Sequence, residues 1–199
     1  MGSRRSRDKD KTITDVLSSA RRLFSRNGLH GTSIRDIEND SGVSKGLILH
    51  HFGTKDALYA AVQDQLSQEY VAVMAAGRLA SEGFRELVAT TIRNSFHHLK
   101  ENQEYRRISL WSYLEEQERN SDLEQRFTEA LVSAMRTGQQ SGLVREDIDP
   151  FVMPFIIRGT IEYWIRKEKL IRELTASADD RSRGSDEGLI DALVNLFLR

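Results

Sequence analysis

The chain has 199 residues, of which 39% are apolar and 30% are charged, and it contains no cysteine. This composition predicts a globular protein with a substantial core, and it excludes disulfides and thiolate metal sites. The net charge of −1 is uneven, because residues 1–55 hold 11 Lys and Arg against 6 Asp and Glu, while the remaining 144 hold 18 against 24. A basic N-terminal segment on an acidic remainder is typical of a protein that contacts phosphate at one end.

Helix-forming residues dominate the sequence. Long stretches rich in Ala, Leu, Glu, Arg and Gln, with Pro150 and Pro154 as the two prolines, predict an all-α fold. No apolar run approaches the roughly 20 residues that span a bilayer, so we expect no membrane segment.

Residues 1–11 are polar and carry five cationic side chains among serines and aspartates. We predict a flexible basic arm here. Such an arm either reaches phosphates and an adjacent minor groove or is a solvated tail, and both interpretations stay open. Residues 12–27 place Val16, Ala20 and Phe24 at helical spacing, and Gly28 follows as a helix C-cap.

Residues 32–55 predict two short helices joined by a tight corner. Ser33 and Asp36 have the spacing of a capping box, and Ser44 is placed to cap the second helix. Gly42 can take the positive φ that a sharp corner between helices needs. This pattern is typical of a helix-turn-helix, whose second helix enters the DNA major groove.

This region resembles the DNA-binding domain of the TetR family of bacterial transcriptional repressors. The resemblance covers about residues 12–60 and rests on two runs, Gly31-Thr32-Ser33-x-Arg35-Asp36-Ile37 and Ser41-Gly42-Val43-Ser44-Lys45-Gly46. The sequence departs from the family at Glu38 and Ser41, which are commonly alanine, at Leu47, commonly threonine, and at Leu49, commonly tyrosine.

The predicted second helix assigns different roles to its ends. Ser44, Lys45 and Gly46 lie in the N-terminal turn, which reaches base edges in this motif. Leu47 and Leu49 either contact thymine methyl groups, or one of them is covered by the next helix and reads nothing. We expect His50 and Lys55 to hold phosphates. The predicted DNA-binding residues are Thr32, Ser33, Arg35, Ser44, Lys45, Gly46, Leu47, Leu49, His50 and Lys55.

The rest of the chain predicts further amphipathic helices. They occupy about residues 56–77, 84–100, 103–119, 121–141 and 150–174, followed by a helix near the C-terminus. We therefore expect three parts, which are the arm at 1–11, a DNA-binding domain at 12–55 and a helical effector-binding and dimerisation domain at 56–199.

The family resemblance implies a cavity for a small-molecule effector between the helices of this second domain. Aromatic side chains at helical spacing are more often core, so the sequence alone leaves both interpretations open. The candidate effector-binding residues are Phe96, Tyr105, Trp111, Tyr113, Arg158 and Tyr163.

The resemblance also implies a homodimer through the last two major helices. The alternative is that their large apolar residues form an intramolecular core. The candidate interface residues are Phe127, Leu131, Ala134, Gly138, Phe155, Gly159 and Tyr163.

Catalytic motifs are missing from the sequence: there is no Gly-rich phosphate loop after a strand, no His-Glu-x-x-His and no nucleophile elbow. We therefore expect no enzyme, no cofactor and no metal site. The resemblance implies a cytoplasmic, ligand-responsive repressor that binds a pseudopalindromic DNA operator as a homodimer. The alternative is a helical protein that binds small molecules, lipids or partners without specific DNA recognition.

Overall fold

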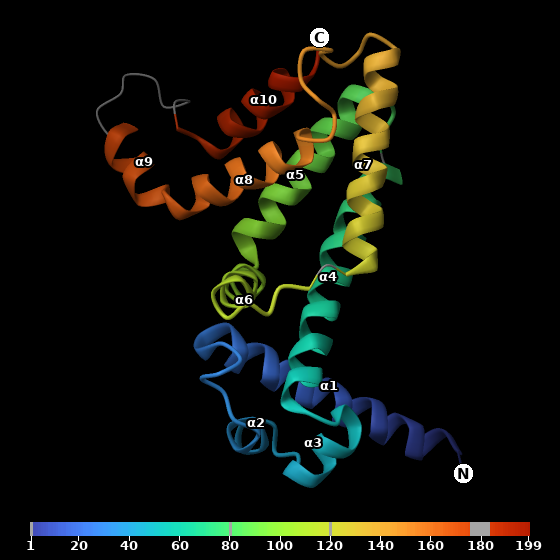
Figure 1. Cartoon of the computed structure of the whole chain (residues 1–199), viewed down its shortest axis with the longest axis vertical. Coiled ribbons are helices and arrows are strands. Elements are labelled where there is room, and N and C mark those ends of the chain that lie inside the picture. The colour runs from blue at the N-terminus through green and yellow to red at the C-terminus, as the bar shows by residue number, and fades with distance from the viewer. Residues whose placement is uncertain (1, 80, 120, 176–183) are drawn as a thin grey trace. The chain divides into compact units, whose positions relative to one another are not determined.

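A computed structural model describes residues 2–79, 81–119, 121–175 and 184–199 (Figure 1). These residues form ten helices and no strand, with a single isolated β-bridge between Val144 and Leu198. The predicted all-α fold is confirmed. The helices are α1 (Gly2–Asn27), α2 (Ile34–Ser41), α3 (Lys45–Phe52), α4 (Lys55–Leu79), α5 (Phe84–Glu101), α6 (Gln103–Leu114), α7 (Asp122–Gln140), α8 (Met153–Arg166), α9 (Glu168–Thr175) and α10 (Asp186–Phe197).

The chain divides into two compact units. The N-terminal unit comprises Met1–Gln68 and Asn102–Ser121, and the C-terminal unit comprises Glu69–Glu101 and Asp122–Arg199. Helix α4 therefore contributes its first half to one unit and its second half to the other.

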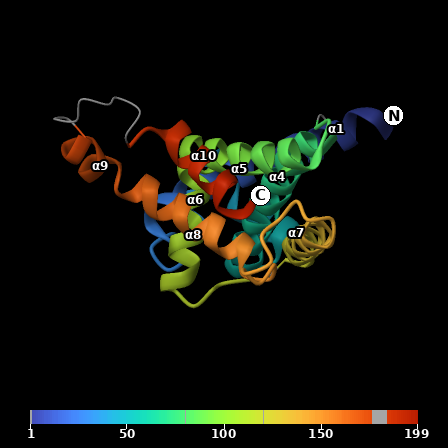
Figure 2. The ribbon, with the colours of Figure 1, turned by 90° about the horizontal axis from the view of Figure 1, so that it is seen from above.

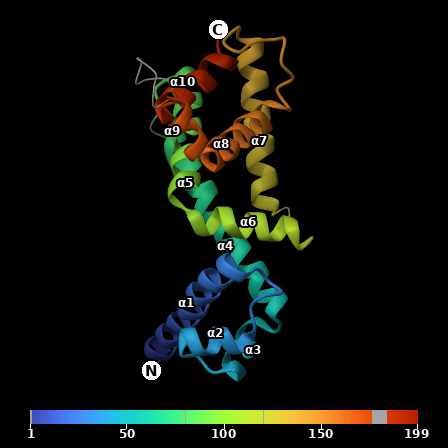
Figure 3. The same cartoon turned by 90° about the vertical axis from the view of Figure 1, so that its left-hand side faces the viewer.

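The N-terminal unit is built around the apolar face of α1. Val16, Ala20 and Phe24 recur every four residues and are fully buried, so they form one continuous stripe. The ring of Phe24 meets Tyr59 of α4 edge to face, with 4.9 Å between centroids. Helices α2 and α3 lie next to one another and α2 packs on α1 (Figure 3), where Ile37 closes the core.

Helix α1 starts much earlier than the sequence predicted. It begins at Gly2 rather than near Thr12, so the predicted arm at 1–11 is the first part of a 26-residue helix within the described residues. Arg and Lys are good helix formers, and a long helix needs no separate cap inside this stretch. The hydroxyl of Thr14 donates to the Asp10 carbonyl oxygen at 2.9 Å, one turn back.

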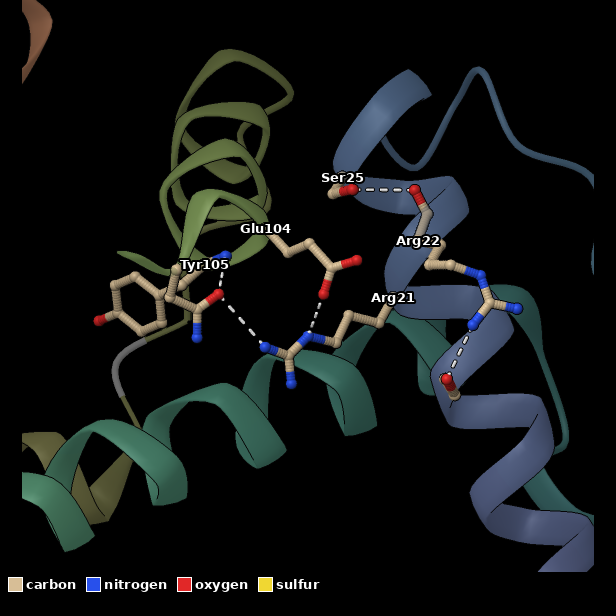
Figure 4. Close-up of polar contacts among 7 residues, drawn as sticks. Arg21, Arg22, Ser25, Glu104 and Tyr105 are labelled. Atoms are coloured by element: carbon tan, nitrogen blue, oxygen red, sulfur yellow. Dashed lines mark hydrogen bonds and ion pairs between the residues drawn. The ribbon is translucent and has the colours of Figure 1, made fainter. Parts of the chain in front are cut away.

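Helix α6 belongs to the N-terminal unit, whereas the sequence analysis placed it in the domain at 56–199. Helix α6 buries Tyr105 and Ile108, and its polar contacts with α1 are not visible in its apolar spacing. Arg21 of α1 donates from Nε to the Glu104 carboxylate at 2.6 Å, at the start of α6 (Figure 4). Arg107 of α6 donates from Nε to the Ser25 carbonyl oxygen at 2.6 Å, which satisfies an otherwise open carbonyl near the end of α1.

The far end of α6 fixes the corner after α1. The Glu115 carboxylate accepts hydrogen bonds from the backbone N–H groups of Leu29, at 2.8 Å, and His30, at 3.0 Å. A side chain at Gly28 would collide with Glu115 and Trp111. Helix α6 therefore holds the start of the segment that leads into α2.

The C-terminal unit is centred on α5, whose Val88, Ile92, Phe96 and Leu99 are buried. Helix α10 lies along α5 (Figure 2) and buries four apolar side chains of its own. The Asp186 carboxylate pairs with Lys100 of α5 and accepts a hydrogen bond from the Trp164 indole of α8 at 3.1 Å. The predicted helix at 150–174 is interrupted at Lys167, where α8 ends before α9.

Within the ranges given above, no helix is long and apolar enough to cross a bilayer.

Candidate nucleic-acid interface and ligand cavity

The start of α2 has the predicted capping box. Ser33 Oγ accepts from the Asp36 backbone N–H at 3.2 Å, and the Ser33 N–H donates to the Asp36 carboxylate at 2.8 Å. Hydrogen bonds from the Ser33 hydroxyl and backbone lower the pKa of Asp36 below its usual value. This reciprocal cap sets where α2 begins.

The corner between α2 and α3 is made by Gly42, as predicted. Its φ of +71° lies in the left-handed region, and its N–H donates to the Glu38 carbonyl oxygen at 2.9 Å to close α2. An added Cβ would meet no atom within 4 Å. The requirement for glycine is therefore conformational and not a matter of space.

Two residues cap α3, and one of them was predicted from the sequence. Ser44 Oγ accepts from the Leu47 backbone N–H at 3.4 Å, as predicted. The Glu38 carboxylate of α2 accepts from the Lys45 backbone N–H at 2.8 Å. Sequence spacing gave no signal for this second cap, because residues seven apart meet here only through the bend at Gly42.

Helix α3 buries one side and exposes the other. Ile48 is fully buried, whereas Ser44, Lys45, Gly46 and His50 are exposed. Leu47 is 40% exposed, whereas Leu49 is partly buried. The fold therefore covers Leu49 more than Leu47. The polar, N-terminal part of α3 is therefore accessible. Ser33 and Arg35, at the start of α2, are also exposed.

Asp40 ties α2 to α1. Its carboxylate accepts hydrogen bonds from the Ser19 hydroxyl and the Arg22 guanidinium, both at 2.6 Å. These two bonds, with Ser19 making the larger contribution, lower the pKa of Asp40. Sequence spacing gave no signal for this junction, because Asp40 lies 21 residues from Ser19.

Thr32 and Lys55 both have hydrogen-bond partners within the protein, and their predicted roles at DNA stay predictions. Thr32 is 1% exposed, and its hydroxyl donates to the Gly28 carbonyl oxygen at 2.9 Å. The Lys55 ammonium donates to the carbonyl oxygens of Leu29, at 2.7 Å, and Thr32, at 2.8 Å. Backbone carbonyl oxygens of the loop that follows α1 therefore accept hydrogen bonds from both side chains.

The C-terminal unit contains a cavity of about 150 Å³ bounded by α4, α5, α7 and α8. Its wall is mainly aliphatic and aromatic. Its described lining residues are Tyr70, Met74, Ala75, Leu87, Val88, Thr91, Ile92, Ser95, Phe127, Ala130, Leu131, Ala134, Met135, Pro154, Ile157 and Arg158.

Of the six predicted effector-binding residues, Arg158 lines this cavity and the other five do not. Phe96 is fully buried in the core of α5, and Tyr163 is 58% exposed on α8. Tyr105, Trp111 and Tyr113 lie on α6 and so belong to the N-terminal unit. Aromatic side chains of the core, the surface and a cavity wall have the same spacing in sequence, which is why periodicity could not separate them.

The predicted dimer residues divide into two groups. On α7, Phe127, Leu131 and Ala134 line the cavity of their own subunit, and a side chain at Gly138 would collide with Phe84 and Val144. These four positions thus have contacts within their own subunit, and their predicted part in a dimer interface stays a prediction. On α8, by contrast, Phe155, Gly159 and Tyr163 are exposed.

No group of three or more His, Cys, Asp or Glu residues with a metal-binding arrangement occurs among the described residues.

Comparison with known proteins identifies both halves of the chain. A family model described as "Bacterial regulatory proteins, tetR family" matches residues 16–62, and one described as "Tetracyclin repressor-like, C-terminal domain" matches residues 89–188. The HTH-type transcriptional repressor KstR2 of Rhodococcus jostii is 26% identical over 153 residues, which are 68% of this chain and 69% of that protein. The HTH-type transcriptional repressor Rv3405c of Mycobacterium tuberculosis is 45% identical over 58 residues, 29% of this chain and 31% of that protein.

Solved structures agree on the fold. The putative transcriptional regulator SCO4942 of Streptomyces coelicolor superposes with a TM-score of 0.73 at 20% identity, covering 94% of this chain and 98% of the other. At this level of identity the likeness shows the fold alone.

Proposed function

The chain belongs to the TetR family of DNA-binding transcriptional regulators, and from this premise we propose that it represses transcription as a homodimer on a pseudopalindromic operator. We further propose that a small molecule in the cavity of the C-terminal unit weakens this binding. The activity is one of binding and not of catalysis, and it takes place in the cytoplasm, where bacterial DNA is found.

The observation that carries the proposal is the exposed, doubly capped start of α3. Ser44 and Glu38 fix the first turn of this helix, so Lys45 and Gly46 are presented in one conformation before DNA arrives. A recognition helix held in this way pays less conformational entropy on binding. Lys45 and the exposed Leu47 supply a cationic donor and an apolar contact for base edges or thymine methyl groups.

A stripe on α8 supports the dimer. Phe155 and Tyr163 are 56% and 58% exposed, and Gly159 between them leaves open space where a side chain would stand. Phe151, whose ring centroid lies 5.4 Å from that of Phe155, extends the stripe. Large apolar residues on either side of a glycine suit close packing against the same helix of a second copy, because a C2 interface is self-complementary.

Helix α4 supports a link between ligand and DNA. Its first half belongs to the unit that contains α3, and its second half contributes Tyr70 and Met74 to the cavity wall. If the effector favours a conformation that binds DNA less well, then DNA weakens effector binding by the same factor.

Selection of bound duplexes from a random library, followed by titration at several salt concentrations, tests the proposal. We expect one enriched sequence with two inverted half-sites centred about 10 base pairs, or a multiple of that, apart. Affinity for it should fall steeply with salt while exceeding that for random DNA by at least about 10³. Weak binding that is indifferent to sequence would instead support the helical binding protein without DNA recognition.

A further inference from the structure

The cavity has an apolar body and one polar end. Most of its wall is aliphatic or aromatic. Its polar lining residues are Tyr70, Thr91, Ser95 and Arg158, and Tyr70 contacts both Ser95 and Arg158 at what we call the polar end. The Tyr70 hydroxyl and Ser95 Oγ lie 3.2 Å apart, and either oxygen can be the donor. The Arg158 guanidinium lies 5.1 Å from the centroid of the Tyr70 ring.

The positive charge of Arg158 at this end of the cavity is balanced by the carboxylate of Glu162. Among the described residues that line the cavity, Arg158 is the one with a formal charge at neutral pH. Its Nε donates to the Glu162 carboxylate at 2.5 Å, one turn further along α8. Both side chains are about one-third exposed or less, so solvent screens this pair only in part. Arg158 therefore brings donors to the wall without bringing net charge.

This balance disfavours charged ligands. A carboxylate placed against Arg158 would share the guanidinium with Glu162, and two carboxylates on one cation leave a net negative charge in a mainly apolar space. An ammonium group would face Arg158 itself. A neutral hydroxyl or carbonyl group meets neither cost, because the Tyr70–Ser95 pair can either donate to it or accept from it.

The volume sets the size of the apolar portion. A cavity of about 150 Å³ lined by Leu, Ile and Phe holds one benzene molecule. We propose that the effector is an uncharged molecule that places a ring-sized apolar portion in this cavity and one hydroxyl or carbonyl group at Tyr70 and Ser95. This inference rests on the proposed function, in which the cavity is the effector site.

Calorimetry at pH 7 with three probes that share a tolyl group distinguishes an apolar, a neutral polar and an anionic ligand. They are toluene, 4-methylphenol and 4-methylbenzoate, of which the last is ionised at this pH because carboxyl groups titrate near pH 4. We expect 4-methylphenol to bind several-fold more tightly than toluene and at least about tenfold more tightly than 4-methylbenzoate. A preference for 4-methylbenzoate, equal affinities for all three, or no binding of any would overturn the proposal.

The Glu162→Gln variant tests the charge argument, because it should bind an anionic probe more tightly than the wild-type protein does. Removing this carboxylate takes away one negative charge that competes for Arg158, so affinity for 4-methylbenzoate should rise about tenfold while affinity for toluene stays the same. Glu173→Gln on α9, which removes a carboxylate from a long and exposed ion pair with Lys169, is the matched control and should change neither. An unchanged affinity for 4-methylbenzoate in Glu162→Gln would contradict the charge argument even if the wild-type preferences hold.

Operator binding is measured on the same samples before any probe is added. Failure of the unliganded protein to bind a selected duplex refutes the proposed function but leaves the order of probe affinities intact. An operator-binding protein with the wrong order of affinities refutes the ligand class alone.

Discussion

The ammonium nitrogen of Lys55 lies 2.7 Å from the carbonyl oxygen of Leu29, and this contact joins the start of α4 to the loop between α1 and α2. A second bond to the Thr32 carbonyl oxygen at 2.8 Å makes Lys55 a clamp on the protein's own backbone. In the unbound protein this cation therefore stabilises the position of α2.

Replacing Lys55 by methionine should reduce the free energy of unfolding by about 2 kcal/mol, since hydrogen bonds from a charged donor are worth about 1.5–3 kcal/mol and the side chain is partly exposed. Urea unfolding followed by circular dichroism measures the change. Lys45→Met is the control, because Lys45 is exposed, and it should leave the stability within about 0.5 kcal/mol of wild type. Equal effects of the two substitutions would refute the structural role of Lys55.

Acid should weaken the junction between α1 and α2 through Asp40. The folded state lowers the pKa of this carboxyl by hydrogen bonds from Ser19 and Arg22, so its stabilisation is present above the unfolded-state pKa of about 3.9. The stabilisation is lost as the pH falls through the lower pKa of the folded state. Asp40→Asn should therefore cost about 1 kcal/mol at pH 7, a modest value because the side chain is 39% exposed.

The difference between Asp40→Asn and wild type should shrink as the pH is lowered from 4 to 2, and urea midpoints at several pH values show whether it does. A difference that is constant over this range would mean that the charge of Asp40 does not contribute.

Local rules predicted the helix-turn-helix well, and they failed where distant segments meet. The caps at Ser33 and Ser44 and the turn at Gly42 depend on neighbours within four residues, so sequence spacing was enough to find them. Glu38 also caps α3, but across a bend, and no spacing rule describes that contact.

The position of α6 also depends on contacts that local spacing rules cannot predict, here between residues far apart in the sequence. Its apolar spacing predicted a helix but not which unit it joins, because Arg21 and Arg107 reach partners more than 80 residues away. Likewise, apolar spacing on α7 was compatible with a dimer interface or with a cavity wall. Its place in the cavity wall depends on the residues of α5 and α8 that line the same cavity, and these could not be read from the sequence of α7 alone.

Lys45 should contribute to DNA affinity without contributing to the fold. It is exposed in the first turn of α3, where the motif reaches base edges. Lys45→Ala should weaken binding to the selected operator by about tenfold or more per half-site, since a good contact to a base is worth about 1–3 kcal/mol. Fluorescence anisotropy with the operator and with a scrambled duplex shows whether the loss is specific, and an unchanged operator affinity would remove Lys45 from the recognition surface.

The α8 stripe should control the oligomeric state. Phe155→Arg places a charge in the middle of the exposed stripe formed with Phe151 and Tyr163, so two copies could not pack there without burying two cations. We expect this variant to sediment as a monomer at concentrations where the wild-type protein is a dimer, with its helical content unchanged. Leu110→Arg, at a position 49% exposed on α6, is the matched control and should remain dimeric.

Because a two-fold operator engages two copies of α3, the monomeric Phe155→Arg variant should also bind the operator less tightly than the wild-type protein does. This loss of affinity should be smaller at high protein concentration. If Phe155→Arg sediments as a dimer of unchanged stability, then the two copies meet through another surface.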